Sequence, residues 1–130
     1  IMRTIPNYQR LVDLLPSDYN TITLCQGNFT LMTDDLPKAI RGFGKKISFV
    51  HFRDVEGVPT NFHETWHDAG KTDMLATMKA YRDIEFDGVL RPDHVPTVEG
   101  DSNENAGYSA FGRLYAIGYI RGLHEAVYAK

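Results

Sequence analysis

The order of apolar and polar residues predicts short strands that alternate with helices along the chain. Runs of β-branched and other apolar residues predict strands over residues 21–27, 47–55 and 88–94. Apolar residues that recur every three or four positions predict helices over residues 8–15, 72–84 and 108–128. A further helix is expected between a cap at Asp34 or Asp35 and a stop at Gly44. The remaining long segments, residues 56–70 and 97–107, are predicted as loops.

The first predicted helix takes its expected limits from the residues at its ends. Asn7 suits an N-cap, because its side-chain oxygen can accept a hydrogen bond from the first turn, and Pro16 cannot continue a helix. Between them an apolar stripe is expected to face the core, formed by Leu11, Leu14 and Leu15.

Strands that alternate with helices at this spacing indicate βαβ units, and hence an α/β protein with a parallel sheet. Such a sheet is either covered on both faces or closed into a barrel. A closed (β/α)8 barrel needs about 250 residues, whereas this sequence has 130. We therefore expect part of a barrel or a small open sheet. Pro92 cannot donate a hydrogen bond to a neighbouring strand, so we place it where the pairing of the third strand ends.

Composition excludes several classes of partner and site. The 14 basic and 17 acidic side chains give a formal charge of −3, so no basic face is expected for nucleic acid or an anionic membrane. The single cysteine excludes an internal disulfide and a zinc site with four cysteines. No apolar run approaches the roughly 20 residues that span a bilayer.

Each predicted strand carries a polar side chain close to its carboxyl end. Successive side chains of a strand face opposite sides of the sheet, which puts Cys25, His51 and Asp93 on one face. The carboxyl ends of parallel strands are where α/β proteins place their sites. A thiolate, an imidazole and a carboxylate suit a divalent ion such as Fe, Zn or Mn. The pattern therefore predicts a metal site at this edge of the sheet.

Each of these three residues also has a purely structural interpretation. Cys25 can be a small buried apolar residue, and His51 a hydrogen-bonded residue of the core. Asp93 can be a turn residue or a helix cap. Their shared position at the strand ends keeps the metal site open beside these alternatives.

A second pattern with metal-binding potential is His63-Glu64-Thr65-Trp66-His67, which fits the zinc-protease motif His-Glu-x-x-His. That motif requires a helix, and Pro59 and Gly70 leave room for only a turn or two. No third ligand lies at the usual spacing, so we expect no zinc-protease site here.

Four segments together resemble one enzyme family. In order they are Leu24-Cys25-Gln26-Gly27, Phe49-Val50-His51-Phe52-Arg53-Asp54-Val55, Arg91-Pro92-Asp93-His94-Val95-Pro96, and Gly107-Tyr108 followed by Gly112-Arg113-Leu114. These segments closely resemble mannonate dehydratase, and the likeness extends over nearly the whole chain. The segment at residues 91–96 is the most specific of the four.

The resemblance implies a fold and an extent. Members of the family are longer and form a (β/α)8 TIM barrel related to the xylose-isomerase-like sugar enzymes. Residues 1–130 would then be one partial barrel domain, its C-terminal part with about strands six to eight. The N-terminal part of the barrel is absent from this sequence. A His-Pro-Asp-Asp-Pro motif that contributes another metal-ligating histidine would precede Ile1.

The resemblance also implies an activity. The family dehydrates D-mannonate to 2-dehydro-3-deoxy-D-gluconate with a divalent metal, Fe²⁺ or Mn²⁺, in hexuronate (glucuronate) catabolism. Cys25, His51 and Asp93 match its metal ligands, His94 and Tyr108 match residues that move protons, and Asp93 is a further candidate for proton transfer. We expect a cytoplasmic homo-oligomer that takes a small sugar acid as substrate and binds neither nucleic acid nor membrane.

Two arginines, Arg53 and Arg91, are candidates for binding the carboxylate of the substrate. Guanidinium groups bind carboxylates through paired hydrogen bonds, although a salt bridge within the barrel is an equal alternative for both residues. Two functional alternatives also stand: another metal-dependent sugar isomerase or epimerase on the same barrel, and an inactive structural fragment.

Overall fold

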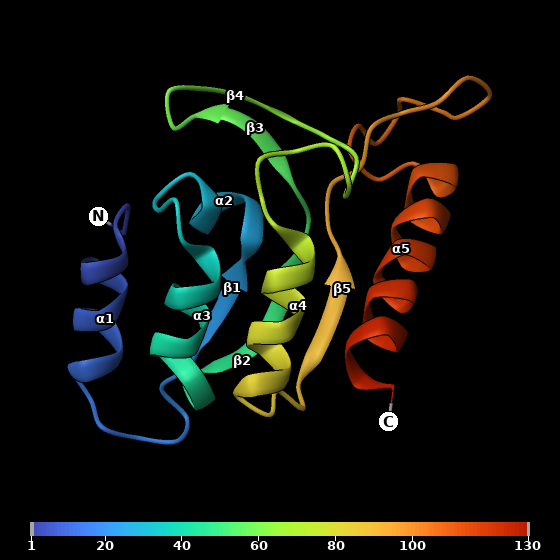
Figure 1. The fold of residues 1–130 in the computed structure, drawn as a ribbon. Coiled ribbons are helices and arrows are strands. Elements are labelled where there is room, and N and C mark those ends of the chain that lie inside the picture. The colour runs from blue at the N-terminus through green and yellow to red at the C-terminus, as the bar shows by residue number, and fades with distance from the viewer. Residues whose placement is uncertain (1, 130) are drawn as a thin grey trace.

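The computed structural model describes residues 2–129 and shows a parallel sheet packed against helices (Figure 1). The sheet has the strand order β1-β2-β5, formed by β1 (Ile22–Cys25), β2 (Ile47–Phe52) and β5 (Val89–Pro92). The predicted α/β class with parallel strands is therefore confirmed. Within the described residues, β1 and β5 each pair with a neighbour on one side only.

The main helices lie along one side of this sheet (Figure 1). The helical elements are α1 (Ile5–Asp13), α2 (Gln26–Thr30), α3 (Leu36–Phe43), the 3₁₀ turn η1 (Gly44–Lys46), α4 (Met74–Asp83) and α5 (Ala110–Tyr128). Helix α3 contacts α4, and α5 packs against α4 and β5. No helix within residues 2–129 is long and apolar enough to cross a membrane.

Alternation along the strands separates a buried face of the sheet from an open one. Leu24, Val50 and Phe52 are fully buried and join the core with residues of α3 and α4. Burial of an apolar side chain of this size contributes about 1.5–3 kcal/mol. On the opposite face Thr23 and Val89 are exposed. The face that carries the predicted ligands is therefore the open one.

The first helix starts earlier than predicted, because a different residue caps it. Thr4, not Asn7, is the N-cap: its hydroxyl oxygen accepts a hydrogen bond from the Asn7 backbone N–H at 3.3 Å. Pro6 then occupies the first turn, where its missing N–H costs nothing.

The predicted apolar stripe of this helix is wrong. Leu11, Leu14 and Leu15 are exposed, and the residues of this helix that face the core are the buried Val12 and the partly buried Ile5 and Tyr8. The helix ends before Leu15, since the side chain of Asn20 donates to backbone carbonyls at its end, including that of Val12 at 3.0 Å. An end capped from outside the helix leaves no signal in the helical pattern.

The first strand is shorter than predicted, because its last two residues begin α2 instead. Gln26 is fully buried, and its amide nitrogen lies 3.4 Å from the sulfur of Met74. Its amide oxygen accepts a hydrogen bond from the Tyr81 hydroxyl at 3.0 Å. These contacts tie the end of β1 to α4.

Residues 56–70 are not a single loop, as predicted, but contain most of an antiparallel hairpin. It consists of β3 (Val55–Val58) and β4 (Asn61–Glu64), and it lies over the carboxyl ends of the sheet strands (Figure 1). Gly57 has φ +116°, and a Cβ there would lie 2.4 Å from the Asn61 carbonyl oxygen. The hairpin therefore requires glycine at this position. The second predicted strand is also shorter than expected, because β2 ends at Phe52 and Val55 already belongs to the hairpin.

The next two helices begin at aspartate N-caps, and the cap of α3 is one of the two residues predicted for it. Asp35 caps α3 and Asp73 caps α4, each carboxylate accepting a backbone N–H of the first turn. Gly44 ends α3 with φ +53°. Helix α5 starts two residues later than predicted, after Ser109 at its N-cap position.

Candidate metal and proton-transfer site

The register of the sheet brings the predicted metal ligands together. Cys25 pairs with His51, and His51 pairs with Arg91, so their side chains share the open face. Asp93 follows Arg91 by two residues, just beyond the end of β5. Cys25, His51 and Asp93 each offer one ligand atom, and these atoms lie within 4.8 Å of one another.

The three side chains fit a divalent metal ion. Asp93 Oδ2 lies 3.9 Å from Cys25 Sγ and 3.7 Å from His51 Nδ1. Two ligands of one tetrahedral ion, each bound at about 2.0–2.3 Å, lie about 3.3–3.8 Å apart. Small side-chain rotations would therefore bring all three atoms onto one ion.

The buried guanidinium of Arg53 contacts two of these ligands and two further residues. Its Nε lies 3.3 Å from Cys25 Sγ and 3.2 Å from Asp93 Oδ2. Its Nη2 donates to Asn28 Oδ1 at 3.1 Å, and its Nη1 donates to Glu64 Oε1. Burial acts to lower the pKa of Arg53, but the charges and hydrogen bonds of Cys25 and Glu64 outweigh it and raise that pKa. Arg53 therefore stays charged and fully engaged within the protein.

Gly27 leaves the space that the Arg53 side chain fills. A Cβ at residue 27 would lie 2.7 Å from the Arg53 guanidinium carbon. The glycine that follows the predicted strand is thus explained by this close approach, at the start of α2.

Asp93 is an ionised carboxylate in this setting. Burial acts to raise its pKa, but the hydrogen bond from Arg91, the charges that His94 and His51 carry when protonated, and the charge of Arg53 bring the pKa below its usual value. A carboxylate with a low pKa suits a metal ligand and holds a proton weakly.

The predicted proton-transfer residues form a connected chain of hydrogen bonds. His94 Nε2 lies 2.9 Å from the Tyr108 hydroxyl, and that hydroxyl lies 3.5 Å from Asp93 Oδ1. The other ring nitrogen of His94, Nδ1, lies 3.1 Å from Glu64 Oε1. The Arg113 guanidinium lies 5.2 Å from the centre of the Tyr108 ring. The chain reaches from the hairpin to the residues just before α5.

The two arginines, Arg53 and Arg91, differ in their exposure and in how many of their nitrogens are already hydrogen-bonded within the protein. Arg91 donates to Asp93 Oδ1 at 2.9 Å, its side chain is 38% exposed, and its Nε has no hydrogen-bond partner within residues 2–129. The Arg53 side chain is 5% exposed, and all three of its nitrogens are engaged. For Arg53 the structure thus shows the salt-bridge alternative.

The histidines of the zinc-protease pattern do not meet. His63 is exposed on β4, whereas His67 is fully buried after the hairpin with Nε2 2.8 Å from the Phe52 carbonyl oxygen. No helix carries the two residues, as expected from the sequence. His67 therefore belongs to the core.

Sequence reasoning missed Glu64 and Asn28 as parts of the site. In the sequence, Glu64 stands out only as part of the zinc-protease pattern. Its place in the site depends on the hairpin, which brings it into contact with Arg53, 11 positions earlier, and with His94, 30 positions later. The turn-forming Pro59 between two short apolar-polar alternations was the available signal for that hairpin.

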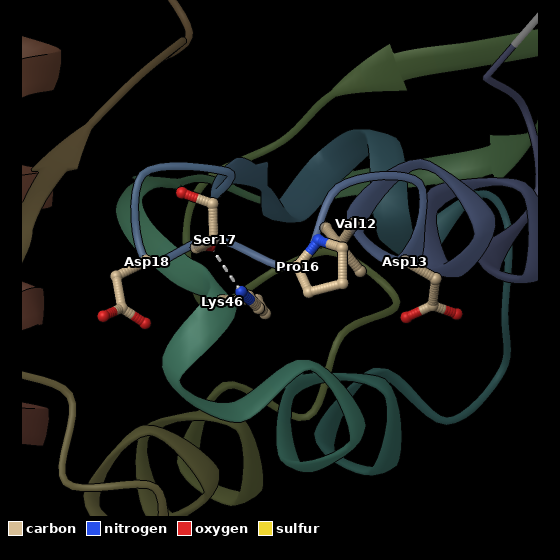
Figure 2. Close-up of a pocket in the computed structure, with 6 residues that line it drawn as sticks. All are labelled: Val12, Asp13, Pro16, Ser17, Asp18 and Lys46. Atoms are coloured by element: carbon tan, nitrogen blue, oxygen red, sulfur yellow. Dashed lines mark hydrogen bonds between the residues drawn. The ribbon is translucent and has the colours of Figure 1, made fainter.

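A surface hollow at the other end of the sheet carries no comparable group. Figure 2 shows its lining: Val12, Asp13, Pro16, Ser17, Asp18 and Lys46. These residues precede β1 and β2, and the Lys46 ammonium already donates to the Ser17 carbonyl oxygen at 2.7 Å. The carboxyl ends of the strands are therefore the candidate functional site.

Comparison with known proteins decides the family. The family model described as D-mannonate dehydratase (UxuA) matches residues 1–130. The chain belongs to the D-mannonate dehydratase family. The mannonate dehydratase of Enterococcus faecalis is 39% identical over 100% of this chain, and that of Oceanobacillus iheyensis is 38% identical over 98%. The resemblance seen in four sequence segments is confirmed.

Structural comparison agrees with this family. The crystal structure of mannonate dehydratase from Streptococcus suis serotype 2 matches 98% of this chain with a TM-score of 0.90 and 32% identity. The chain covers 38% of that structure and 37% of each of the two curated relatives. It thus spans a little over a third of the length of its relatives.

Proposed function

We propose that this chain supplies active-site residues of a lyase that dehydrates D-mannonate to 2-dehydro-3-deoxy-D-gluconate and water, in hexuronate catabolism. The observation that carries the proposal is the contact between a possible metal site and a proton-transfer pair. The Tyr108 hydroxyl lies 2.9 Å from His94 Nε2 and 3.5 Å from Asp93 Oδ1. Membership of the D-mannonate dehydratase family supports the same chemistry.

We further propose that the sheet is the C-terminal part of a (β/α)8 barrel, about strands six to eight. The parallel order, the helices on one face and the polar residues on the other all suit such a barrel. In this arrangement the open face would line the barrel interior, and the outer edges of β1 and β5 would pair with further strands.

Cys25, His51 and Asp93 would hold the divalent ion, either Fe²⁺ or Mn²⁺. When bound, such an ion would draw negative charge from the carboxylate and a hydroxyl of the sugar acid, which makes the C2 proton easier to remove. The Nε of Arg53 contacts both Cys25 Sγ and Asp93 Oδ2 and so fixes the positions of two ligand atoms.

Dehydration needs one group that takes the proton from C2 and another that protonates the hydroxide leaving C3, so that the elements of water are lost. Tyr108 and His94 are the pair proposed for these roles, because they share a hydrogen bond and are partly accessible. Asp93 was also a candidate, but its lowered pKa and its bonds to arginine favour a ligand role. Arg91 is the residue proposed to bind the substrate carboxylate, since its side chain is 38% exposed at the open face of the sheet.

A chimaera tests the proposal directly. In it, this chain replaces the matching segment of the Enterococcus faecalis mannonate dehydratase, which is 39% identical. Loaded with Mn²⁺, the chimaera should convert D-mannonate to a 2-keto-3-deoxy acid, detected as its semicarbazone. An isomeric sugar acid as product would support an isomerase or epimerase instead. A folded chimaera without any turnover would refute the proposal.

A further inference from the structure

We propose that Glu64 is a positioning residue that fixes the tautomer of His94, with the proton on Nδ1 and the lone pair of Nε2 directed at Tyr108. The claim about the tautomer concerns this chain alone, whereas the claim about turnover rests on the proposed function. Glu64 reaches the site from the β3–β4 hairpin, which is separate from the sheet whose strands carry Cys25, His51 and Arg91.

The hydrogen bonds of Glu64 Oε1 support this assignment. It lies 3.1 Å from His94 Nδ1 and also accepts from Arg53 Nη1. A carboxylate oxygen beside a guanidinium can only accept, so the contact with His94 requires a proton on Nδ1. In a neutral imidazole the other nitrogen then lacks a proton. His94 Nε2 is therefore the acceptor in its 2.9 Å hydrogen bond, and Tyr108 is the donor.

Arg53 holds Glu64 in place for this task. The Arg53 side chain is 5% exposed, and its Nε and Nη2 are held by Asp93 and Asn28. The second carboxylate oxygen of Glu64 is buried and has no hydrogen-bond partner within residues 2–129. Both known contacts of the carboxylate thus pass through Oε1, between a fixed guanidinium and His94. The arrangement resembles a carboxylate that orients a catalytic imidazole from behind.

Proton transfer depends on this orientation. With Nδ1 protonated, Nε2 can take a proton from Tyr108 or from the substrate and later return it. The imidazolium formed in between would keep its Nδ1–H directed at the carboxylate. If the tautomer were reversed, Nε2 would carry a proton and could not act as an acceptor. By fixing the tautomer, Glu64 therefore makes His94 the proton acceptor in the first proton transfer.

Nitrogen NMR on the ¹⁵N-histidine-labelled chimaera tests the tautomer without substrate. The His94 ring signals are assigned by their loss in His94→Gln. We expect a protonated Nδ1 and an unprotonated Nε2 in the parent chimaera. A proton on Nε2 there would overturn the proposal, whatever the activity. Glu64→Leu should shift His94 towards the other tautomer, whereas Glu64→Gln should keep the parent tautomer, since its amide oxygen can still accept.

Kinetics then tests the consequence for turnover. Glu64→Leu should lower kcat by about 100-fold, the lower range for a lost acid or base, and leave KM within about threefold. Glu64→Gln should restore kcat to within about tenfold of the parent. The control Glu56→Leu removes a carboxylate from the exposed outer part of the same hairpin and should change neither value.

The outcomes separate this inference from the proposed function. If the parent chimaera has the expected tautomer but no dehydratase activity, the proposed function fails and the positioning role stands. If Glu64→Leu leaves the His94 tautomer unchanged, the positioning role fails even when the parent is active. A kcat that falls equally in the Leu and Gln variants would mean that Glu64 acts by its charge and not by its hydrogen bond, which would also contradict the proposal.

Discussion

The Nε of Arg53 lies 3.2 Å from Oδ2 of Asp93, and both side chains are almost completely buried. The same guanidinium also contacts Cys25 and Glu64. One cation therefore joins a strand end, the residue after β5 and the hairpin. Because buried charges are tolerated only when paired, these groups depend on one another.

Removal of the Arg53 charge should destabilise the protein strongly. In Arg53→Leu the carboxylates of Asp93 and Glu64 lose a buried partner, and we expect a loss of about 3–5 kcal/mol. Thermal unfolding of the chimaera would show this as a lower Tm. The matched control is Arg41→Leu, which breaks an exposed pair with Asp83 and should change Tm little. Equal decreases of Tm in the two variants would contradict the claim that Asp93 and Glu64 depend on the buried charge of Arg53.

The isolated chain should bind a divalent ion, because Cys25, His51 and Asp93 lie together. The affinity should be weak, because this group supplies three ligands and the family is expected to use a further histidine. Titration with Co²⁺ should produce a sulfur-to-metal charge-transfer absorption that is lost in Cys25→Ala. Submicromolar affinity that persists in Cys25→Ala would place the ion elsewhere. A useful control is His124→Ala, an exposed histidine of α5 outside the ligand group.

Tyr108→Phe in the chimaera should lower kcat by about 100-fold or more, while metal and substrate binding persist. The substitution removes only the hydroxyl that contacts His94 and Asp93. Steady-state kinetics on D-mannonate provides the measurement. Near-normal kcat would remove Tyr108 from proton transfer and leave His94 as the residue to examine.

Arg91→Gln should raise KM by about 10- to 100-fold and change kcat less, if the guanidinium binds the carboxylate of the substrate in both ground and transition states. The partial exposure of its side chain beside Asp93 supports this expectation. The alternative result, an unchanged KM with a reduced metal affinity, would show that Arg91 acts only on Asp93.

His67 should make stability depend on pH. Burial lowers the pKa of His67 below its usual value of 6.5 and outweighs the hydrogen bond to the Phe52 carbonyl oxygen and the charges of Asp68 and Glu64, which raise it. Below pH 6.5 the unfolded chain therefore binds a proton that the folded chain does not, and stability falls as pH falls towards the lowered pKa. The slope attributable to one group is at most about 1.4 kcal/mol per pH unit.

Unfolding midpoints of the chimaera between pH 8 and 5 would measure this effect. His67→Gln can still donate to the Phe52 carbonyl but cannot titrate, so its midpoint should change less over this range. Parallel pH profiles of parent and variant would show that His67 is not the group responsible.

The grouping of the three candidate ligands could be predicted because it depends on two regular features: alternation along each strand and the common edge of parallel strands. Cys25, His51 and Asp93 followed from these features alone. Their structural alternatives are weakened by the close approach of their ligand atoms. The expected homo-oligomer and cytoplasmic location stay predictions.

The parts that were missed depend on contacts between distant segments. The predicted stripe of Leu11, Leu14 and Leu15 failed, because the core-facing side of the helix is formed by Ile5, Tyr8 and Val12 and the helix ends at Asp13. Glu64 was missed because its partners come from a strand end and a later loop. Local patterns describe single elements well, but they do not show which loop side chains meet.

The pairing of Cys25 with His51 and of His51 with Arg91 has a consequence for length variation. A single inserted residue in β1, β2 or β5 would turn every later side chain of that strand to the other face, so a ligand would enter the apolar core and a core residue would replace it. Deletions and insertions should therefore be nearly absent from the strands of functional relatives. They should be far more frequent among the exposed residues 102–106, where no register has to be kept.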